Sequence, residues 1–206
     1  MPGNRALPSR GSLSVFLNIP YDARFENLYL AYIAGITAFG LVPRATLEIP
    51  GGTRRLDRIF ELIQACDYSI HDLSRVQLDR HRPVTPRFNM PFELGLAVAW
   101  EGLEHRHTWY VCEEVERRLQ KSLSDLNGSD VYVHGGTVSG VFRELCSAFV
   151  RSTHQPSVQT MLAIYRDLKR TLPSIMKHAG ASSPYTARVF KDLCVRARAV
   201  HTEIQA

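Results

Sequence analysis

Glu93 is the residue of this sequence that is best suited to chemistry. It lies in the segment Pro86-Arg-Phe-Asn-Met-Pro-Phe-Glu-Leu-Gly-Leu-Ala, where Pro91 is typical of the first turn of a helix. A helix dipole favours an ionised carboxylate near its start, whereas apolar neighbours disfavour it by desolvation. An acid between these effects can act as a nucleophile or a base. The spacing equally fits a structural glutamate that accepts hydrogen bonds from backbone N–H groups.

Further polar residues follow apolar runs that are typical of buried strands. Asp72 ends one such run, where it could bind sugar hydroxyls or cap a turn, and Ser74 follows it without the histidine arrangement of a nucleophile. Asn18 precedes Pro20 and Tyr21 in the first run. Asn18 could orient a ligand or tie down the following loop, and Tyr21 could stack on a base or cover the core.

Arginines gather in one region of the chain. Arg75, Arg80, Arg82 and Arg87 follow the Asp72 run, and Arg54 and Arg55 precede it. They are either solvated loop residues or an electropositive rim for phosphate groups. The net charge of +5 and the pI near 9.2 favour an anionic partner such as a nucleotide or nucleic acid. Because no basic tail concentrates this charge, we do not expect a nucleic-acid partner.

The elements that must position these residues alternate along the chain. Strands are predicted at 14–20, 41–49, 67–73, 108–112 and 131–133, and helices at 25–40, 55–66, 92–101, 115–126 (a short helix or loop) and 137–149. This alternation predicts an α/β fold with a five-stranded parallel sheet covered on both faces. Ligands of such sheets bind beyond the carboxyl ends of the strands. The segments 18–21, 44–48, 72–74 and 89–93 should therefore meet at one edge, which brings in Arg44, Asn89 and Met90.

The chain of 206 residues divides into three predicted parts. Residues 1–12 read as a disordered leader, residues 13–150 form the α/β domain, and residues 151–206 form a C-terminal α-helical extension. Amphipathic helices are predicted at 156–172 and 185–204. They either pack on the α/β domain or form a dimer contact. The segment 74–89 reads as a long polar loop, which in a compact domain is usually functional or mobile.

Several classes of protein are disfavoured by the sequence. No apolar stretch is long enough for a membrane span, and the N-terminus lacks the apolar region of a signal peptide, so we expect a cytoplasmic protein. Four cysteines lie far apart, which favours free thiols over a zinc site or disulfides. The absence of a dinucleotide-binding glycine fingerprint and of a Walker A loop disfavours a hydride-transferring enzyme and a P-loop NTPase.

Three segments carry a resemblance to a known superfamily. Phe16-Leu-Asn-Ile-Pro-Tyr21, Ile70-His-Asp-Leu-Ser74 and Asn89-Met-Pro-Phe-Glu-Leu-Gly-Leu-Ala97 resemble the nucleoside 2-deoxyribosyltransferase and TIR-like superfamily. Residues 14–150 as a whole look most like uncharacterised bacterial TIR-like proteins. The resemblance implies a flavodoxin-like sheet with a catalytic glutamate on the helix after the third strand. The lead into that helix, Arg87–Pro91, departs from the Gly-Thr or Ser-Gly-Thr that is usual in the transferases.

The resemblance also implies a role for each matching residue. Glu93 matches the glutamate that attacks the anomeric carbon of a deoxynucleoside or assists cleavage of the nicotinamide–ribose bond of NAD. Asp72 matches the aspartate that holds the sugar hydroxyls or supports the site, and Asn18 to Tyr21 match the loop that lines the base pocket. The residues expected to bind substrate are Asn18, Pro20, Tyr21, Arg44, Asp72, Ser74, Arg87, Asn89 and Met90.

The expected function is therefore that of an N-glycosidic-bond enzyme. It would be a hydrolase, transferase or cyclase that acts on NAD or a related nucleotide through Glu93, with no metal and no further cofactor, in a bacterial defence system. The alternative is a non-catalytic nucleotide sensor or a TIR-like assembly module. Homo-oligomers through the C-terminal helices and a protein partner in such a defence system are also expected.

Overall fold

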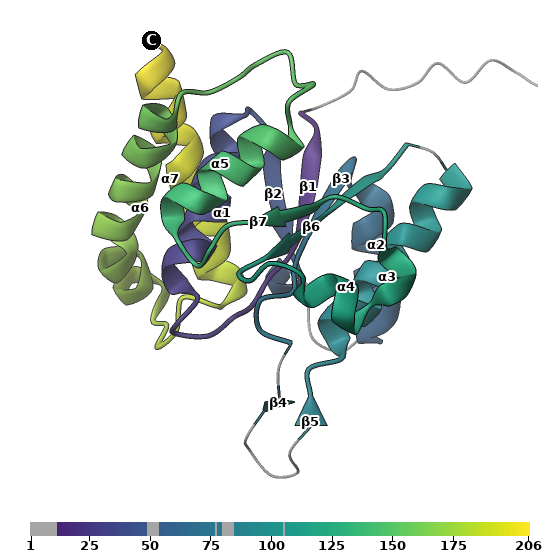
Figure 1. The fold of residues 1–206 in the computed structure, drawn as a ribbon. Helices are drawn as coiled ribbons and strands as arrows, with labels where there is room; N and C mark the ends of the chain where they lie inside the picture. Colours follow the sequence, from purple (N-terminus) through teal and green to yellow (C-terminus); the bar gives the residue numbers. More distant parts are fainter. Residues whose placement is uncertain (1–11, 49–53, 77, 80–84, 105) are drawn as a thin grey trace, which may run out of the picture.

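The computed structural model describes residues 12–48, 54–76, 78–79, 85–104 and 106–206 (Figure 1). Three features of the sequence lie outside these residues: the predicted leader up to residue 11, the end of the second predicted strand at residue 49, and the positions of Arg80 and Arg82.

A five-stranded, all-parallel sheet forms the centre of the fold, as the sequence predicts. Its strand order is β2-β1-β3-β6-β7. The strands are β1 (Ser14–Asn18), β2 (Val42–Ala45), β3 (Tyr68–Asp72), β6 (Thr108–Glu113) and β7 (Val131–Val133). This order, with helical crossovers, is that of the flavodoxin-like fold. In this order the chain moves outward from β1 in both directions, so a crevice is expected beyond the carboxyl ends of β1 and β3.

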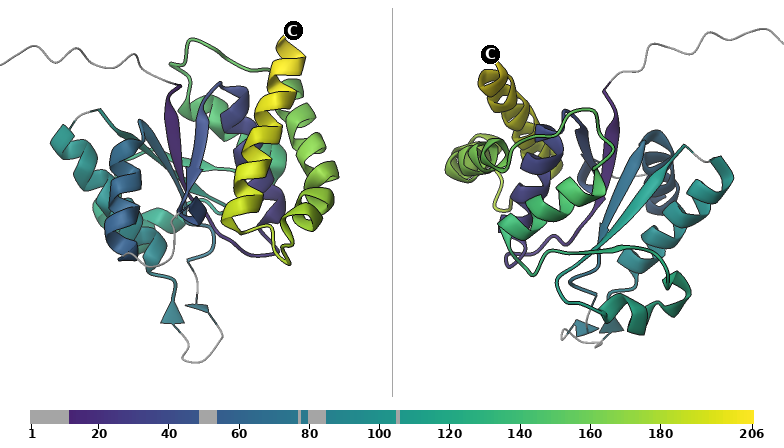
Figure 2. Two further views of the ribbon diagram at one scale, coloured as in Figure 1. Left: turned by 180° about the vertical axis from the view of Figure 1, so that it is seen from behind. Right: turned by 45° about the horizontal axis from the view of Figure 1, so that its top comes forward.

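Helices connect the strands, and further helices come after the last strand in the chain. They are α1 (Glu26–Ala38), α2 (Arg55–Ala65), α3 (Asn89–Glu104), α4 (Arg118–Ser122), α5 (Val138–Ala148), α6 (Val158–Ala179) and α7 (Ala187–Gln205), with 3-10 turns η1 (Thr46–Glu48) and η2 (Ser124–Leu126). α2 and α3 lie on one face of the sheet, and α1 and α5 on the other (Figures 1 and 2).

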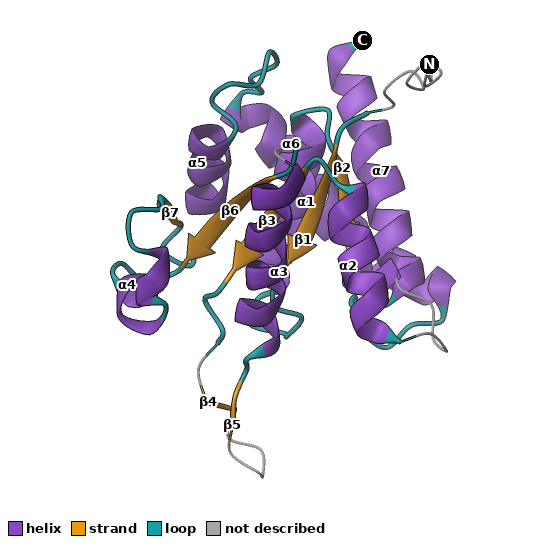
Figure 3. Cartoon of the chain, turned by 90° about the vertical axis from the view of Figure 1, so that its right-hand side faces the viewer, coloured by secondary structure: helices purple, strands orange, loops and turns teal. Residues whose placement is uncertain are grey.

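Some boundaries differ from those predicted. β2 ends at Ala45, because the Glu48 carboxylate accepts the Ala45 N–H (2.9 Å) and turns the chain into η1. α3 begins three residues earlier than predicted. The segment 74–89 is not entirely a loop, since β4 (Leu78–Asp79) and β5 (Thr85–Pro86) pair within it. This arm projects beyond the carboxyl ends of β1 and β3 (Figure 3).

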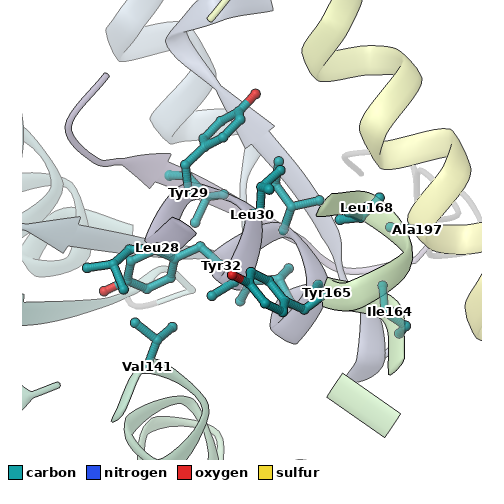
Figure 4. Packing of buried hydrophobic residues seen from close by; sticks show 14 of the residues in the cluster. Leu28, Tyr29, Leu30, Tyr32, Val141, Ile164, Tyr165, Leu168 and Ala197 are labelled. Carbon is teal, nitrogen blue, oxygen red and sulfur yellow. The ribbon is translucent and has the colours of Figure 1, made fainter. Parts of the chain in front are cut away.

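The C-terminal helices are part of the same core as the sheet. All residues of α1 from Leu28 to Ala38 are buried, because the sheet covers one side of the helix and α6 and α7 cover the other. Figure 4 shows Ile164, Leu168 and Ala197 packed against this helix. An almost uniformly apolar α1 thus requires a third layer. The pair at 151–206 packs on the α/β domain, one of its two predicted placements.

Two further observations bear on the excluded classes. Among the described residues, no helix has the length and apolarity of a bilayer span. The four cysteines are free thiols, with Cys66 and Cys112 buried.

Candidate functional site

A cavity of about 200 Å³ lies beyond the carboxyl end of β1, at the switch point of the sheet. Residues of three connections line it: the loop after β1, the turn after β2 with the start of α2, and the start of α3. They are Asn18, Ile19, Pro20, Tyr21, Thr46, Arg55, Arg87, Asn89, Met90 and Glu93. The structure therefore brings together seven of the ten predicted site residues. Three lining residues, Ile19, Thr46 and Arg55, were not among them.

Glu93 is the acid of this cavity. It is the fifth residue of α3 and is 5% exposed, and no hydrogen bond to its carboxylate is found among the described residues. The structural role, in which it would accept backbone N–H groups, is thus not seen there. Burial raises its pKa from the ordinary 4.5 to about 7, although the nearby positive charge of Arg55 lowers it. A carboxyl group with this pKa exchanges its proton near neutral pH.

Asn18 fixes the start of α3 against β1. Its Nδ2 donates one hydrogen bond to the Met90 carbonyl (3.0 Å) and lies 3.0 Å from His71 Nδ1 in β3. These bonds join three elements of the site: the end of β1, the end of β3 and the first turn of α3. Asn18 is 4% exposed, so its polar atoms are either used inside the protein or directed to the cavity that it lines.

Tyr21 lines the cavity and contacts Thr46 and two other tyrosines. Its hydroxyl accepts a hydrogen bond from Thr46 Oγ1 (3.4 Å), and its ring lies 5.7 Å from that of Tyr185 and 6.3 Å from that of Tyr29. Burial raises the pKa of the Tyr21 phenol, which stays neutral. The Tyr185 hydroxyl donates to the Asp22 carbonyl (2.5 Å). The segment before α7 therefore supports the loop that carries the site.

Asp22 joins the loop after β1 to the long connection after β3. Its carboxylate lies 3.3 Å from Arg75 Nε and 3.6 Å from an Arg87 terminal nitrogen. Asp22 does not cap the following helix, because α1 begins four residues later at Glu26. Its carboxylate instead pairs with two of the predicted rim arginines, of which Arg87 lines the cavity.

Asp72 and Ser74 lie outside the cavity, in a sealed polar cluster. Asp72 Oδ2 accepts hydrogen bonds from Tyr32 Oη (2.8 Å) and His134 Nε2 (3.0 Å), and Asp72 Oδ1 accepts the Ser74 N–H (3.0 Å). Asp72 is fully buried, and Ser74 and His134 are 1% exposed. Asp72 thus contacts the protein and not the cavity of Glu93.

This cluster contains serine, histidine and aspartate but lacks the geometry of a catalytic triad. Ser74 Oγ and Asp72 Oδ2 both contact Nε2 of His134, at 3.1 and 3.0 Å. Nδ1 of the same ring accepts the Gly136 N–H (3.0 Å). A triad needs the hydroxyl and the carboxylate on opposite ring nitrogens. The cluster is therefore a structural network that joins β3, α1 and the end of β7.

Arg44 also lies away from Glu93. Its guanidinium pairs with Glu48 (3.0 Å) at the edge of the sheet, where it lines a separate groove of about 1120 Å³ between β2 and α7. The apolar lining of this groove includes Leu41, Pro43 and Phe190.

In the part of the chain that the structure describes, no three His, Cys, Asp or Glu side chains are grouped so that they could hold a metal ion.

Comparisons with known proteins add no family assignment. No protein-family model matches the sequence, and no curated protein has significant similarity to it.

Proposed function

We propose that this protein is a nucleotide N-glycosidic-bond enzyme, an NAD hydrolase or cyclase or a deoxyribosyltransferase-like enzyme, with Glu93 as its catalytic residue. The observation that carries the proposal is a buried carboxyl group that lines a cavity at the switch point of a flavodoxin-like sheet, with a pKa of about 7. A protein does not gain stability from such a carboxylate, so a chemical role is favoured over a structural one.

The reaction would begin with cleavage of the bond between sugar C1 and the base nitrogen. The bonding electrons leave with the base, and the Glu93 carboxylate stabilises or captures the positive C1 centre. In hydrolysis, water then adds its oxygen to C1 and loses a proton. In transfer or cyclisation, a nitrogen or oxygen of a second group takes the place of water. Nicotinamide is a good leaving group here, because its ring nitrogen is cationic before cleavage and neutral afterwards.

The size of the cavity supports binding of one end of the substrate. At about 200 Å³ it is smaller than usual drug-sized pockets of roughly 300–1,000 Å³ and suits a sugar with part of its base. Arg55 and Arg87 line the same cavity and could meet phosphate groups. Asp72 has no part in the proposed site, because its carboxylate is occupied inside the protein. Asn18 and Asn89 are the lining residues that can position sugar hydroxyls instead.

Nicotinamide release from NAD tests the proposal. Wild type, Glu93→Gln and Glu104→Gln should be compared, because Glu104 is an exposed carboxylate on the same helix. We expect Glu93→Gln to lose activity by about 10²–10⁴-fold, the usual worth of a positioned acid or base, and Glu104→Gln to retain it. Equal rates in wild type and Glu93→Gln would exclude the catalytic role. Nucleosides and other nucleotides should be screened alongside NAD by mass spectrometry.

A nucleotide-responsive assembly module is the second candidate, favoured by the apolar groove between β2 and α7. Val195 on α7 lines this groove and is 62% exposed, which suits contact with a second copy or with a protein partner of a defence system. In this case the cavity would bind a nucleotide without turnover. Calorimetry that shows binding, combined with no product after long incubation, would favour this function over catalysis.

A further inference from the structure

A chain of buried hydrogen bonds runs from the cavity wall through the sheet. It begins at the Met90 carbonyl and passes through Asn18, His71, Ser69 and His107 to the Cys66 carbonyl, with distances of 2.8–3.0 Å. Asn18 is 4% exposed and the next three residues are at most 2% exposed. Water therefore has little access to the chain, and each donor must find an acceptor inside it.

Both ends of the chain are carbonyl oxygens, which can only accept, and this fixes every proton between them. Asn18 must present its NH₂ group to Met90, and the second hydrogen then points to His71 Nδ1. His71 is therefore protonated at Nε2 and donates to Ser69 Oγ. The Ser69 hydroxyl donates to His107 Nε2, and His107 Nδ1–H donates to the Cys66 carbonyl.

The charge state of the two histidines agrees with this assignment. Both rings are neutral in it, with one proton each. Burial lowers the pKa of His71 to about 3 and also lowers the pKa of His107. A protonated His71 would turn Nδ1 into a donor that faces the Asn18 NH₂ group. The reverse orientation of Asn18 would place two oxygens, its own and that of Met90, against each other.

We infer that this chain fixes Asn18 with its Oδ1 toward the cavity as a permanent hydrogen-bond acceptor, so that the ligand must present an O–H or N–H donor there. This specificity rests on the proposed function, in which the ligand is a nucleoside or nucleotide. The donor is then a sugar hydroxyl or an amino group of the base. Asn18 is a binding residue, whereas Ser69, His71 and His107 are positioning residues that act through it.

The first test concerns the protons and needs no ligand. Protein with ¹⁵N-labelled histidine should show His71 protonated at Nε2, unchanged between pH 5 and pH 8, and His107 protonated at Nδ1 at pH 8. The signals that disappear in His71→Gln belong to His71, and those that disappear in His107→Gln belong to His107. A proton on Nδ1 of His71, or titration of the His71 ring between pH 5 and pH 8, would overturn the inference whether or not the protein is an enzyme.

The second test identifies the donor by removing one ligand group at a time. Calorimetry would compare adenosine with purine riboside, which lacks the amino group, and with 2′-deoxyadenosine and 3′-deoxyadenosine, in wild type and Asn18→Leu. We expect the loss of one of these ligand groups to weaken binding to wild type by about tenfold. The same loss should leave the affinity for Asn18→Leu unchanged. Equal losses in both proteins for every group would overturn the inference.

Ser69→Ala separates positioning from general stability. Ser69 is buried behind His71 and is not part of the cavity lining. If it positions Asn18, its loss reduces the preference for the donor group and leaves the affinity for the analogue without that group unchanged. Equal weakening for all ligands would assign Ser69 a merely structural role and contradict the positioning chain. No binding of NAD or of any nucleoside would instead overturn the ligand class, and with it the proposed function, while the histidine signals would still decide the proton assignment.

Discussion

Two buried carboxyl groups, Asp72 and Glu93, lie 21 positions apart in the chain, at the two ends of the connection from β3 to α3. They differ in the hydrogen-bond donors that surround them. Asp72 accepts three hydrogen bonds, from a phenol, an imidazole and a backbone N–H. Glu93 accepts none from the described residues and lines a cavity. Both are at most 5% exposed. Burial alone therefore does not distinguish a structural acid from a candidate catalytic one.

The distinction comes from the supply of donors. Polar groups from α1 and from the end of β7 surround Asp72, so its charge is compensated inside the fold. Glu93 has the nearby charge of Arg55 but insufficient donors, so burial dominates and its pKa rises to about 7. The first carboxylate should stabilise the fold, and the second should destabilise it when ionised. Substitutions at the two sites should therefore have opposite signs.

Asp72→Ala should cause the largest change in the free energy of unfolding. It leaves the Tyr32 hydroxyl and the Ser74 N–H without their acceptor in a sealed core, and the His134 Nε2–H with only Ser74 Oγ. The free energy of unfolding should fall by about 3–5 kcal/mol, as measured by urea denaturation. Asp72→Asn keeps an oxygen for the Ser74 N–H and should lose less. A loss below about 1 kcal/mol in Asp72→Ala would contradict the structural role.

Glu93→Gln should stabilise the protein above neutral pH. The folded-state pKa of about 7 exceeds the ordinary 4.5, so the protonated carboxyl is tolerated below pH 4.5 and stability is lost as pH rises through 7. Glutamine does not ionise, so at pH 8 the variant should gain up to about 3 kcal/mol over wild type, and nothing at pH 4. Thermal unfolding at both pH values measures this, with Glu104→Gln as the control. A gain that is independent of pH would show that ionisation of Glu93 is not its cause.

Much of the fold follows from the sequence, because local patterns encode it. Apolar runs that alternate with helical spacing predict all five strands and the parallel sheet. Gly40, the last residue of the helix predicted at 25–40, has a φ of +75° and follows α1, which ends at Ala38. The end of α6 was predicted at residue 172, before Pro173, but the helix continues to Ala179. Its last turns include Ile175, Met176 and Ala179, which pack against the core. Such tertiary contacts outweigh a local helix-breaking signal.

The site was less accessible to sequence reasoning than the fold. Glu93, Asn18 and Tyr21 could be placed at one sheet edge, because parallel strands end there together. The strand end Asp72 was expected beside them, but which way its side chain turns depends on Tyr32 and His134, which come from distant segments. The support of Tyr21 by Tyr185 likewise joins residues 164 positions apart. No local pattern reports such long-range partners.

Arg55→Gln should have the smallest effect and would test why the Glu93 pKa is not higher still. The positive charge of Arg55 lowers that pKa against the larger effect of burial, so removing it should move the pKa upward. Because Arg55 is solvent-exposed, the change should be worth only about 0.2–1 kcal/mol, well under one pH unit. The gain of Glu93→Gln begins near the unfolded-state pKa in either background, but the pH at which it stops growing should rise in the Arg55→Gln background. Arg58→Gln, on the same helix but paired with Glu61, is the matched control. A downward shift in the Arg55→Gln background would mean that water or other groups govern the charge of Glu93, and the contrast with the sealed Asp72 cluster would then need a different electrostatic cause.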